Sequence, residues 1–449
     1  MDRKYLYIQT FGCQMNVNDS DKIVTLLKGE GYGTTDDAEC ADLIIVNTCS
    51  IREKAAQKAY SQLGRFRMLK EQNPDLILAV GGCLAQQYGQ KILTRAPFLD
   101  IVFGTHNIHG LPEFIRRFEN NGSRVVETAF EPSVKSLKMM AMPKYGAVSA
   151  YVTIMQGCNN FCAYCVVPHV RGPEESRPAD DILAEVSKLA DHGVREVTLL
   201  GQNVNAYGKT IGGSIGFPQL LRAIGGIVGI ERIRFTTSHP KDLSEELMRC
   251  FAEVEALCDH IHLPVQSGSD AILGRMNRGY TRDQYLKKVE GLRRFHPGIS
   301  ITSDVIVGFP GEAEADHQAT LELMETVTFD NLFSFKYSER EGTAAAGFDR
   351  QVPENVKSER LQRLQALQQE HTLKRNRMLE GSVQDILVEG KSKNSAHDMT
   401  GRTRSNKIVN FRGGRELAGR TCSALIKKAY LHSLRGEMAE GAEDPCSSK

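Results

Sequence analysis

The sequence predicts an α/β protein made of a parallel α/β sheet domain, a full or partial (β/α) barrel and a small β-barrel. Three observations support this fold class. Apolar runs in the first third each end at a cysteine, strand-like runs alternate with helical patterns in the middle, and glycine separates short β-rich pieces near the end. The expected parts are the sheet domain (1–130), a linker (131–147), the barrel (148–377), the β-barrel (378–437) and a tail (438–449).

Composition places the chain among soluble globular proteins of two or three domains. It has 449 residues, of which 41% are hydrophobic and 25% charged, and a net charge of +1. The N-terminus lacks the apolar core of a signal peptide, and no apolar run approaches the roughly 20 residues of a spanning helix. We therefore expect a cytoplasmic protein without membrane contact. In that reducing compartment, eleven cysteines favour metal or redox chemistry over disulfides.

Cysteines close three apolar runs of the sheet domain. The run "YLYIQTFGC" ends at Cys13, "DLIIVNTC" at Cys49 and "LILAVGGC" at Cys83. Each run predicts a buried strand, and helical segments separate the runs, as in a parallel α/β sheet. Because ligands bind beyond the carboxyl ends of parallel strands, we expect the three thiols to converge on one point. The alternative is three separate buried thiols that act as small hydrophobes.

The middle of the chain carries six strand candidates, from "AYVTIMQGC" to "NLFSFKYS", with helical patterns between most of them. Such repeats predict a (β/α) barrel whose chemistry lies on the loops at the carboxyl ends of its strands. The long polar stretch "ENVKSERLQRLQALQQEHTLKRNRMLEG" is expected to be a helix that closes this part.

The loop after the first barrel strand contains "MQGCNNFCAYC", with Cys158, Cys162 and Cys165. A structural zinc site usually needs four ligands, often as two CxxC pairs, and the chain has only one such pair. Three thiolates could instead hold three irons of a four-iron cube and leave the fourth iron open to chelate a small molecule. The sequence therefore favours an iron–sulfur cluster, with zinc or a redox dithiol as the alternative.

The last part of the chain is basic. Residues 381–435 hold eleven Lys or Arg against four Asp or Glu, a net charge of +7. This concentration indicates a nucleic-acid-binding module, although a merely solvated basic surface is the alternative. The candidate RNA-binding residues are Arg402, Arg404, Lys407, Arg412, Arg415, Lys427 and Lys428.

The stretch "CNNFCAYC" matches the CxxxCxxC pattern of radical S-adenosylmethionine (SAM) enzymes, including Tyr164 before the third cysteine. Together with the upstream cysteines and the basic end, the chain resembles the radical SAM methylthiotransferase family over roughly residues 3–435. That family has an N-terminal methylthiotransferase domain, a radical SAM barrel and a C-terminal TRAM domain. The stretch "GRTRSNKIVNF" is similar to the subgroup that modifies isopentenyladenosine beside the tRNA anticodon.

The resemblance implies radical methylthiolation of C2 of N6-(dimethylallyl)adenosine at position 37 of tRNA. The implied cofactors are two [4Fe–4S] clusters and two SAM molecules per turnover. Cys158, Cys162 and Cys165 would hold the SAM-bound cluster, and the second cluster would be held by Cys13, Cys49 and Cys83. The expected partners are tRNA and a one-electron reductant such as flavodoxin or ferredoxin, and the enzyme is expected to be a monomer.

The resemblance also places cofactor contacts beside the cysteine motif and at barrel strand ends. These candidates are Tyr164, Gly201, Gln202, Asn203, Ser238, Gln266, Val305 and Gly308. Arg171 and Arg177 flank the motif and could pair with the SAM carboxylate or an RNA phosphate. Hydrogen-bonding or packing roles are expected for His169, His239 and His262. The thiols expected to be inert are Cys40, Cys250, Cys258, Cys422 and Cys446.

Other functions stay open at this stage. A relative with the same chemistry could act on threonylcarbamoyladenosine in tRNA, or on an aspartate of a ribosomal protein. The basic last module argues against the protein substrate. From different classes come a non-catalytic iron–sulfur protein that binds RNA, and a zinc-dependent or redox dithiol protein.

Overall fold

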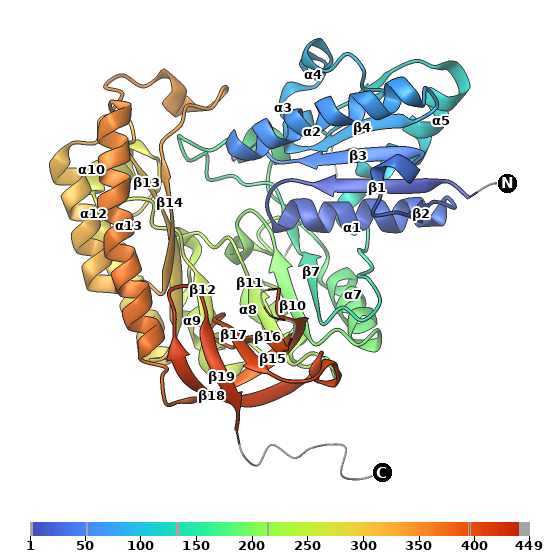
Figure 1. The fold of residues 1–449 in the computed structure, drawn as a ribbon. Helices are drawn as coiled ribbons and strands as arrows, with labels where there is room; N and C mark the ends of the chain where they lie inside the picture. Colours follow the sequence, from blue (N-terminus) through green and yellow to red (C-terminus); the bar gives the residue numbers. More distant parts are fainter. Residues whose placement is uncertain are drawn as a thin grey trace, which may run out of the picture.

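The computed structural model describes residues 3–50, 53–131, 135–212, 215–393, 395 and 397–439 (Figure 1). A parallel sheet, a partial barrel and a small closed barrel follow one another along the chain. Within the described ranges, no helix has both the length and the apolar character that a membrane crossing requires. Cys446 and nearly all of the expected tail lie outside the described residues.

The N-terminal part is a six-stranded parallel sheet in the order β2-β1-β3-β4-β5-β6. Its strands are β1 (Tyr5–Thr10), β2 (Gly33–Thr34), β3 (Leu43–Thr48), β4 (Ile77–Gly82), β5 (Ile101–Phe103) and β6 (Val125–Glu127). The helices are α1 (Gln14–Gly29), α2 (Glu53–Gln72), α3 (Cys83–Tyr88), α4 (Lys91–Arg95) and α5 (Leu111–Asn121), with short turns η1 (Ala38–Cys40) and η2 (Ile108–Gly110). This is the predicted parallel α/β domain.

Helices cover both faces of this sheet, which explains why its strands are continuously apolar. Along β3, Leu43 and Ile45 join the core under α1 and α5, whereas Ile44 and Val46 join the core under α2 and α3. All six residues of β3 are buried. The strand therefore needs apolar side chains in both directions, and the carboxyl edge of the sheet is left for polar chemistry.

The segment between the first two parts is packed against the protein. Its described portion includes the turn η3 (Lys135–Lys138). Lys22 Nζ donates to the carbonyl of Ser136 at 3.0 Å, and Leu137 is buried. The backbone N–H of Met142 donates to Thr25 Oγ1 at 3.1 Å. The segment expected to be a linker thus lies along α1 and helps to fix the sheet domain in place.

The middle part is a partial barrel of parallel strands in the order β7-β10-β11-β12-β13-β14. Two three-stranded sheets meet through a parallel bridge between Ile233 and Leu257. In the described chain, β7 and β14 are not paired with each other, so the ring of strands stays open. The strands are β7 (Ser149–Thr153), β10 (Glu196–Leu200), β11 (Arg232–Phe235), β12 (His260–His262), β13 (Ser300–Val307) and β14 (Asn331–Lys336).

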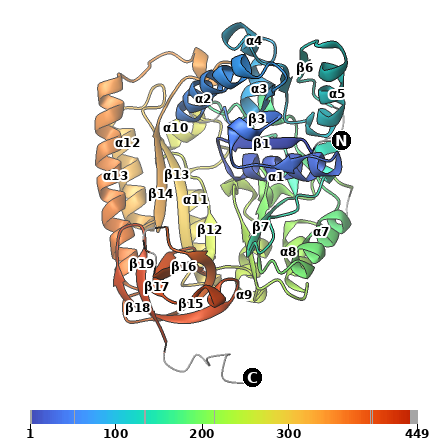
Figure 2. The same cartoon turned by 45° about the vertical axis from the view of Figure 1, so that its right-hand side comes forward.

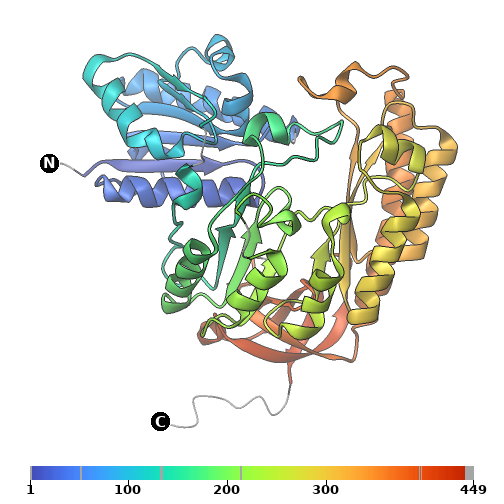
Figure 3. The ribbon, with the colours of Figure 1, turned by 180° about the vertical axis from the view of Figure 1, so that it is seen from behind.

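Helices surround the outer face of the partial barrel (Figure 3). They are α7 (Ala179–Asp191), α8 (Phe217–Gly225), α9 (Glu245–Glu253), α11 (Arg282–Phe295), α12 (Glu314–Val327) and α13 (Glu354–Arg377). The last of these is the long polar helix expected from the sequence, and it packs along β14. Shorter elements lie in the loops: β8 (Met155–Gln156), β9 (Glu175–Ser176), α6 (Val167–Arg171), α10 (Asp270–Arg275), η4 (Val204–Ala206), η5 (Pro240–Asp242) and η6 (Ala344–Gly347).

The C-terminal part is a closed barrel in the order β15-β16-β17-β19-β18. Its elements are β15 (Val383–Lys391), β16 (Asp398–Thr403), β17 (Ile408–Arg412), η7 (Arg415–Leu417), β18 (Thr421–Ala429) and β19 (Leu434–Met438). The sequence indicated β15, β17 and β18 but missed β16 and β19, which are polar and contain glycine. In β16, Gly401 is needed because a Cβ there would lie 2.4 Å from the Leu387 carbonyl oxygen.

This small barrel lies across the amino ends of the partial barrel's strands (Figure 2). At the start of β11, Arg232 donates to the carbonyls of Asp385 and Arg402. Arg234 pairs with Glu196 at 2.8 Å and donates to the Thr403 carbonyl at 2.8 Å. Both side chains of the Arg234–Glu196 pair are nearly buried, at 6% and 7% exposure. The contact therefore depends on desolvated charge as well as on packing.

Replacing Arg234 by alanine should destabilise the protein strongly, because Glu196 would stay buried without its partner. We expect the free energy of unfolding, measured by urea denaturation, to fall by roughly 3–5 kcal/mol. The control is Arg412→Ala on the small barrel, where the described structure shows no ion pair and the change should stay within about 0.5 kcal/mol. Equal stability of the two variants would contradict this prediction.

Candidate functional site

Three cysteines lie together at the carboxyl edge of the N-terminal sheet. Cys13 caps α1 just after β1, Cys49 follows β3, and Cys83 opens α3 after β4. These strands are neighbours in the sheet. The Cys13 and Cys49 side chains are in hydrogen-bond contact, and Cys83 interacts electrostatically with Cys13. The structure thus brings together the thiols that the sequence placed at three separate strand ends.

Glycines directly before two of these cysteines make this close approach possible. Gly12 has a φ of +145°, and a Cβ there would lie 2.6 Å from the Cys49 Cβ. Gly82 has a φ of +89°, and a Cβ there would lie 2.4 Å from the Thr48 carbonyl oxygen. Other residues would be strained in these conformations and would push the neighbouring strand ends apart.

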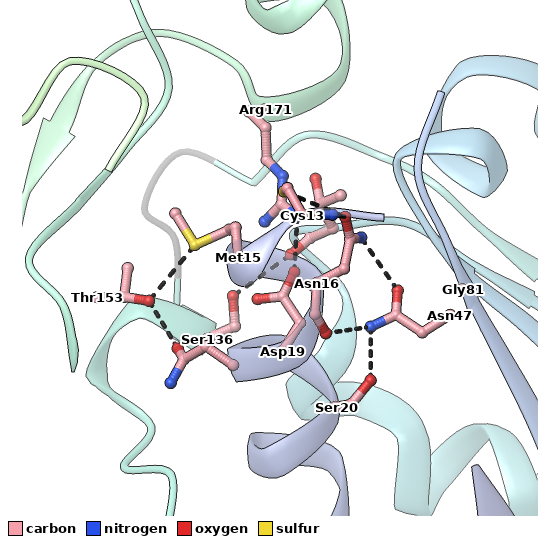
Figure 4. Close-up of polar contacts among 12 residues, drawn as sticks. Cys13, Met15, Asn16, Asp19, Ser20, Asn47, Gly81, Ser136, Thr153 and Arg171 are labelled. Atoms are coloured by element: carbon pink, nitrogen blue, oxygen red, sulfur yellow. Dashed lines mark hydrogen bonds and ion pairs between the residues drawn. The ribbon is translucent and has the colours of Figure 1, made fainter. Parts of the chain in front are cut away.

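Hydrogen bonds of two asparagines fix the cysteine loops in position (Figure 4). Asn16 Oδ1 accepts from both the backbone N–H and the thiol of Cys13, each at 3.3 Å. Its Nδ2 donates to the Thr48 carbonyl at 3.2 Å, beside Cys49. Asn47 Nδ2 donates to the Asn16 carbonyl at 2.8 Å. The sequence analysis missed Asn16, although it follows Cys13 at the spacing of a helix-capping residue.

A buried ion pair connects this triad to the barrel. Arg171, at the end of α6, binds Asp19 of α1 with 2.7 Å between Nη2 and Oδ2, and the two side chains are 3% and 5% exposed. Arg171 Nη1 is buried without a hydrogen-bond partner. Arg171 also interacts with the thiols of Cys13 and Cys83. Its guanidinium therefore lies beside the N-terminal triad. A pairing of Arg171 with the SAM carboxylate or an RNA phosphate stays a prediction.

Arg177 likewise binds other residues of the protein. It pairs with the buried carboxylate of Glu185 and donates to the carbonyls of Thr153 and Asp181. With these partners, Arg177 fixes α7 against the start of the barrel. The structure therefore gives Arg177 a structural role, and its contact with SAM or RNA stays a prediction.

The local environment separates the pKa values of the N-terminal thiols. The pKa of Cys13 falls to about 6, chiefly because the Cys49 thiol donates a hydrogen bond to it, with a further contribution from the charge of Arg171. Burial raises the pKa of Cys83 above its usual value. Before any metal binds, Cys13 is thus the thiol that ionises first of these two.

The second triad lies in the loop between β8 and α6. Cys158, Cys162 and Cys165 interact with one another electrostatically. Asn160 Nδ2 donates to Cys158 Sγ at 3.5 Å, and the backbone N–H of Val167 donates to Cys165 Sγ at the same distance. Burial raises the pKa of Cys165 to about 12, so a cation or metal is needed to hold it as a thiolate.

Arg278 provides a cation at this second triad. Its Nη1 donates to Cys162 Sγ and to Tyr164 Oη, both at 3.2 Å, and Nη2 donates to the Pro264 carbonyl at 2.8 Å. The residue is almost fully buried, at 4% exposure. Arg278 was not among the residues that the sequence singled out.

Helix α6 joins the two triads directly. It begins two residues after Cys165 and ends at Arg171. Val166 and Val170 form a small apolar cluster with Cys83 of the other triad. The five residues of α6 rise about 7.5 Å, so the two sets of thiols lie on either side of one short helix.

Both triads fit thiolate ligation of an iron–sulfur cube. None of these six described cysteines is joined in a disulfide, and each triad has a buried arginine that offsets thiolate charge. In the part of the chain that the structure describes, no three His, Cys, Asp or Glu side chains are placed to hold a single metal ion. Ligands of a cube bind separate irons and therefore stand farther apart than the ligands of one ion.

The barrel presents buried polar atoms without partners next to the second triad. They are Asn203 Oδ1, Ser238 Oγ, His239 Nε2 and Gln266 Oε1, after strands β10, β11 and β12. Gln266 and Thr237 have left-handed φ values of +74° and +69°. Buried polar groups are normally satisfied, so this set indicates a ligand with several donors and acceptors. Burial lowers the pKa of His239 to about 3, and its ring is therefore neutral.

The other candidate SAM contacts have structural partners. Gln202 Oε1 accepts from the backbone N–H of Gly157 at 2.6 Å and so supports the cysteine loop. A Cβ at Gly201 would lie 2.5 Å from Met155, which leaves no room for a side chain. Val305 is buried, and the N–H of Gly308 donates to Glu312 Oε1 at 2.9 Å. These residues shape the strand ends around the unpartnered atoms.

The basic candidates of the C-terminal barrel divide into three groups. Arg404 binds Asp259 and the Leu257 carbonyl, and Lys407 pairs with Asp330 at 2.9 Å, so both attach the small barrel to the larger one. Three more have partners within the small barrel: Arg402 with Glu389, Lys427 with Glu437, and Lys428 over the ring of Tyr430. Arg412 and Arg415 line a cavity of about 460 Å³ together with Lys391 and His397.

Three family models match the chain, one for each part. Their descriptions are uncharacterized protein family UPF0004 for residues 5–104, radical SAM superfamily for 152–324 and TRAM domain for 377–439. Among solved structures, the radical SAM methyltransferase TsrM of Kitasatospora setae has a TM-score of 0.57 at 15% identity. That match covers 74% of this chain and 73% of TsrM and shows a shared fold.

Curated relatives match almost the whole chain. The tRNA-2-methylthio-N(6)-dimethylallyladenosine synthase of Syntrophus aciditrophicus is 62% identical over 438 residues, which is 98% of this chain and 95% of the relative. The synthase of the same name from Geobacter sulfurreducens is 54% identical over 99% of both chains.

In the metal-free protein, Cys13 should be alkylated by iodoacetamide faster than the exposed Cys40. The lowered pKa of Cys13 predicts that its reaction rate rises with pH to half of its maximum near pH 6. The neighbouring Asp37 raises the pKa of Cys40, which should react only at more alkaline pH despite its exposure. Peptide mass spectrometry after timed labelling measures both rates. Faster labelling of Cys40 at pH 7 would contradict the prediction.

Proposed function

We infer that the chain methylthiolates C2 of N6-(dimethylallyl)adenosine in tRNA, because it belongs to the family of tRNA-2-methylthio-N(6)-dimethylallyladenosine synthases. It is a radical SAM enzyme and a transferase. The observation that carries this function is the pair of thiol triads on either side of α6, each with its own arginine. We place the modified adenosine at position 37.

Enzymes of this family use [4Fe–4S] clusters and SAM, which together supply one-electron chemistry, sulfur and a methyl group. We propose that Cys158, Cys162 and Cys165 hold the SAM-bound cluster. The second cluster would be held by Cys13, Cys49 and Cys83. In this proposal each triad leaves one iron without a protein ligand, which is where a small molecule can bind.

In this proposal, side chains at the ends of the barrel strands orient SAM. Asn203, Ser238 and Gln266 offer their unpartnered atoms to SAM, whose amino, carboxylate and ribose groups need such partners. Tyr164, next to Cys165 in the cysteine loop, is held by a hydrogen bond from Arg278. Gly308 lies just after β13 and borders this site, whereas the backbone of Val305 pairs with Gln266 and its side chain packs in the core under the helices. Gly201 and Gln202 support the cysteine loop.

The TRAM part supplies the tRNA contact in this proposal. Arg412 and Arg415 have no ion pair in the described residues, and they line the cavity of the small barrel. Arg402, Lys427 and Lys428 have local partners that a phosphate could displace, whereas Arg404 and Lys407 are held by the larger barrel. The tRNA backbone is the polyanion that such a surface fits.

We propose the remaining features as follows. Each triad is complete within one chain, which supports a monomer. A reductant of the flavodoxin or ferredoxin type would supply the electron. The division into a methylthiotransferase domain (1–130), a radical SAM barrel (148–377) and a TRAM domain (378–437) is supported by where the sheets begin and end. The cytoplasm, where tRNA is modified, is the proposed location.

Removing one cysteine from either triad should abolish the modification in cells. In a strain without the gene, plasmid-borne Cys13→Ala and Cys158→Ala variants should leave the 2-methylthio product absent from total tRNA. The substrate nucleoside N6-(dimethylallyl)adenosine should accumulate in its place. Nucleoside mass spectrometry measures both. The matched control is Cys40→Ala, an exposed thiol outside both triads, which should restore the product. An unchanged tRNA profile in the strain without the gene would overturn the proposed function.

Replacing Arg412 and Arg415 by alanine should weaken tRNA binding about equally for all tRNA sequences. We expect the affinity to fall about tenfold at moderate salt and the dependence on salt to become shallower, since two phosphate contacts are lost. The control is Arg249→Ala, an exposed arginine of α9 on the larger barrel. If both variants bind tRNA as the unmodified protein does, Arg412 and Arg415 are not RNA contacts.

A further inference from the structure

The inner face of the last two barrel strands carries two exposed phenylalanines. In the parallel pairing of β13 and β14, Asp304 lies opposite Phe333, and Ile306 lies opposite Phe335. Alternate residues of a strand point to opposite faces, and paired residues share a face. The other face of β13, with Ile301 and the residues that alternate with it, is buried in the core under the helices. Phe333 and Phe335 therefore point into the partial barrel.

These two rings are incompletely covered in the protein alone. Phe333 is 48% exposed and Phe335 is 41% exposed, although both belong to a strand of the barrel. They are exposed because β14 is an edge strand, which in the described chain is paired only with β13. Adjacent half-exposed aromatic side chains within a site indicate that an apolar group binds there.

This aromatic surface continues into the proposed cofactor site. Ile306, opposite Phe335, packs against the apolar cluster that includes Tyr164 of the second cysteine triad. The backbone N–H of Ile306 donates to the Gln266 carbonyl at 3.0 Å. The surface of Phe333 and Phe335 thus begins next to the atoms that we assign to SAM, on the inner side of the strands.

A polar group borders the same surface. His262 and Asp304 form a pair with 3.4 Å between Nε2 and Oδ2, and their side chains are 15% and 29% exposed. His262 Nδ1 is 3.0 Å from Thr302 Oγ1, which fixes the ring. The His262 ring lies edge to face with Phe333, at 6.0 Å between centroids. A partly exposed carboxylate oxygen therefore adjoins the two phenylalanines.

We propose that Phe333 and Phe335 bind the dimethylallyl group of the substrate adenosine, and that Asp304, oriented by His262, accepts the remaining N6 hydrogen. This inference rests on the proposed function and names the residues that select its substrate. The dimethylallyl group is branched, apolar and uncharged, so it matches two aromatic faces. Asp304 fits the single hydrogen that N6 keeps after prenylation.

The same arrangement excludes the other common modification of this adenosine. A threonylcarbamoyl group carries a carboxylate, which would meet both the aromatic surface and the charge of Asp304. Placing like charges together, and burying a charge against aromatic rings, are both unfavourable. An unmodified adenosine has no repulsion to overcome but leaves the phenylalanines uncovered. The surface therefore attracts the dimethylallylated adenosine, repels the threonylcarbamoylated one and neither attracts nor repels the unmodified one.

RNA binding by the protein with both clusters assembled and without SAM tests this inference. Three anticodon stem-loops are compared, identical except that the target adenosine is unmodified, dimethylallylated or threonylcarbamoylated. The variants are Phe333→Ala, Phe335→Ala and Asp304→Asn. The control is Val228→Ala, which removes an exposed apolar side chain at the opposite end of the strands. Iron content and thermal melting confirm that each variant is assembled before binding is compared.

The unmodified protein should prefer the dimethylallylated RNA. Each phenylalanine variant should lower that preference about tenfold by weakening the dimethylallylated RNA alone, because part of one ring's apolar burial is lost. Asp304→Asn should bind the threonylcarbamoylated RNA more tightly than the unmodified protein does, and Val228→Ala should change nothing.

Two results would overturn the inference: equal binding of the three RNAs by the unmodified protein, or an unchanged preference in both phenylalanine variants. The proposed function is judged separately, by methylthiolation of the dimethylallylated stem-loop when SAM and a reductant are added. Product formation together with either of those results would reject the assigned residues and keep the reaction. Absence of product from the dimethylallylated RNA would instead reject the function on which the inference depends.

Discussion

The buried ion pair between Arg171 and Asp19 sets the relation between the two halves of the site. It joins α1 of the sheet domain to the end of α6, the helix that starts beside Cys165. A buried pair of this kind is costly to separate, since either charge alone would remain desolvated. The sheet edge and the cysteine loop of the barrel therefore keep one arrangement, with Cys13 close to the guanidinium.

Both cysteine triads lie at the carboxyl ends of parallel strands, one triad in the N-terminal sheet and one in the barrel. In the N-terminal sheet that edge carries Cys13, Cys49 and Cys83, and in the barrel it carries polar side chains and the second cysteine loop. Each edge alone would hold one reactive centre. Because α6 joins them directly, clusters held at these two edges would act on the same base of the tRNA, which one-electron chemistry and sulfur transfer to one carbon require.

The sequence was sufficient for features that depend on local pattern. Buried strands that end at cysteines predicted the convergence of Cys13 with its partners, because strand order places neighbouring ends together. Ion pairs between residues far apart in the sequence could not be predicted from local patterns. Asp19 and Arg171 lie 152 residues apart, and neither local sequence indicates that the other residue is its partner. Likewise, counting charge suggested phosphate contact for Arg404, but its partner Asp259 belongs to a barrel loop.

The position of the small barrel has a consequence for the size of the substrate. It is docked at the amino ends of the barrel strands, whereas the thiols and the unpartnered polar atoms lie at the carboxyl ends. Strand β13, with eight residues, measures about 26 Å between those ends. A free nucleoside is far shorter than this. A substrate that contacts both ends at once must be at least this long, a condition that a tRNA meets and a free nucleoside does not.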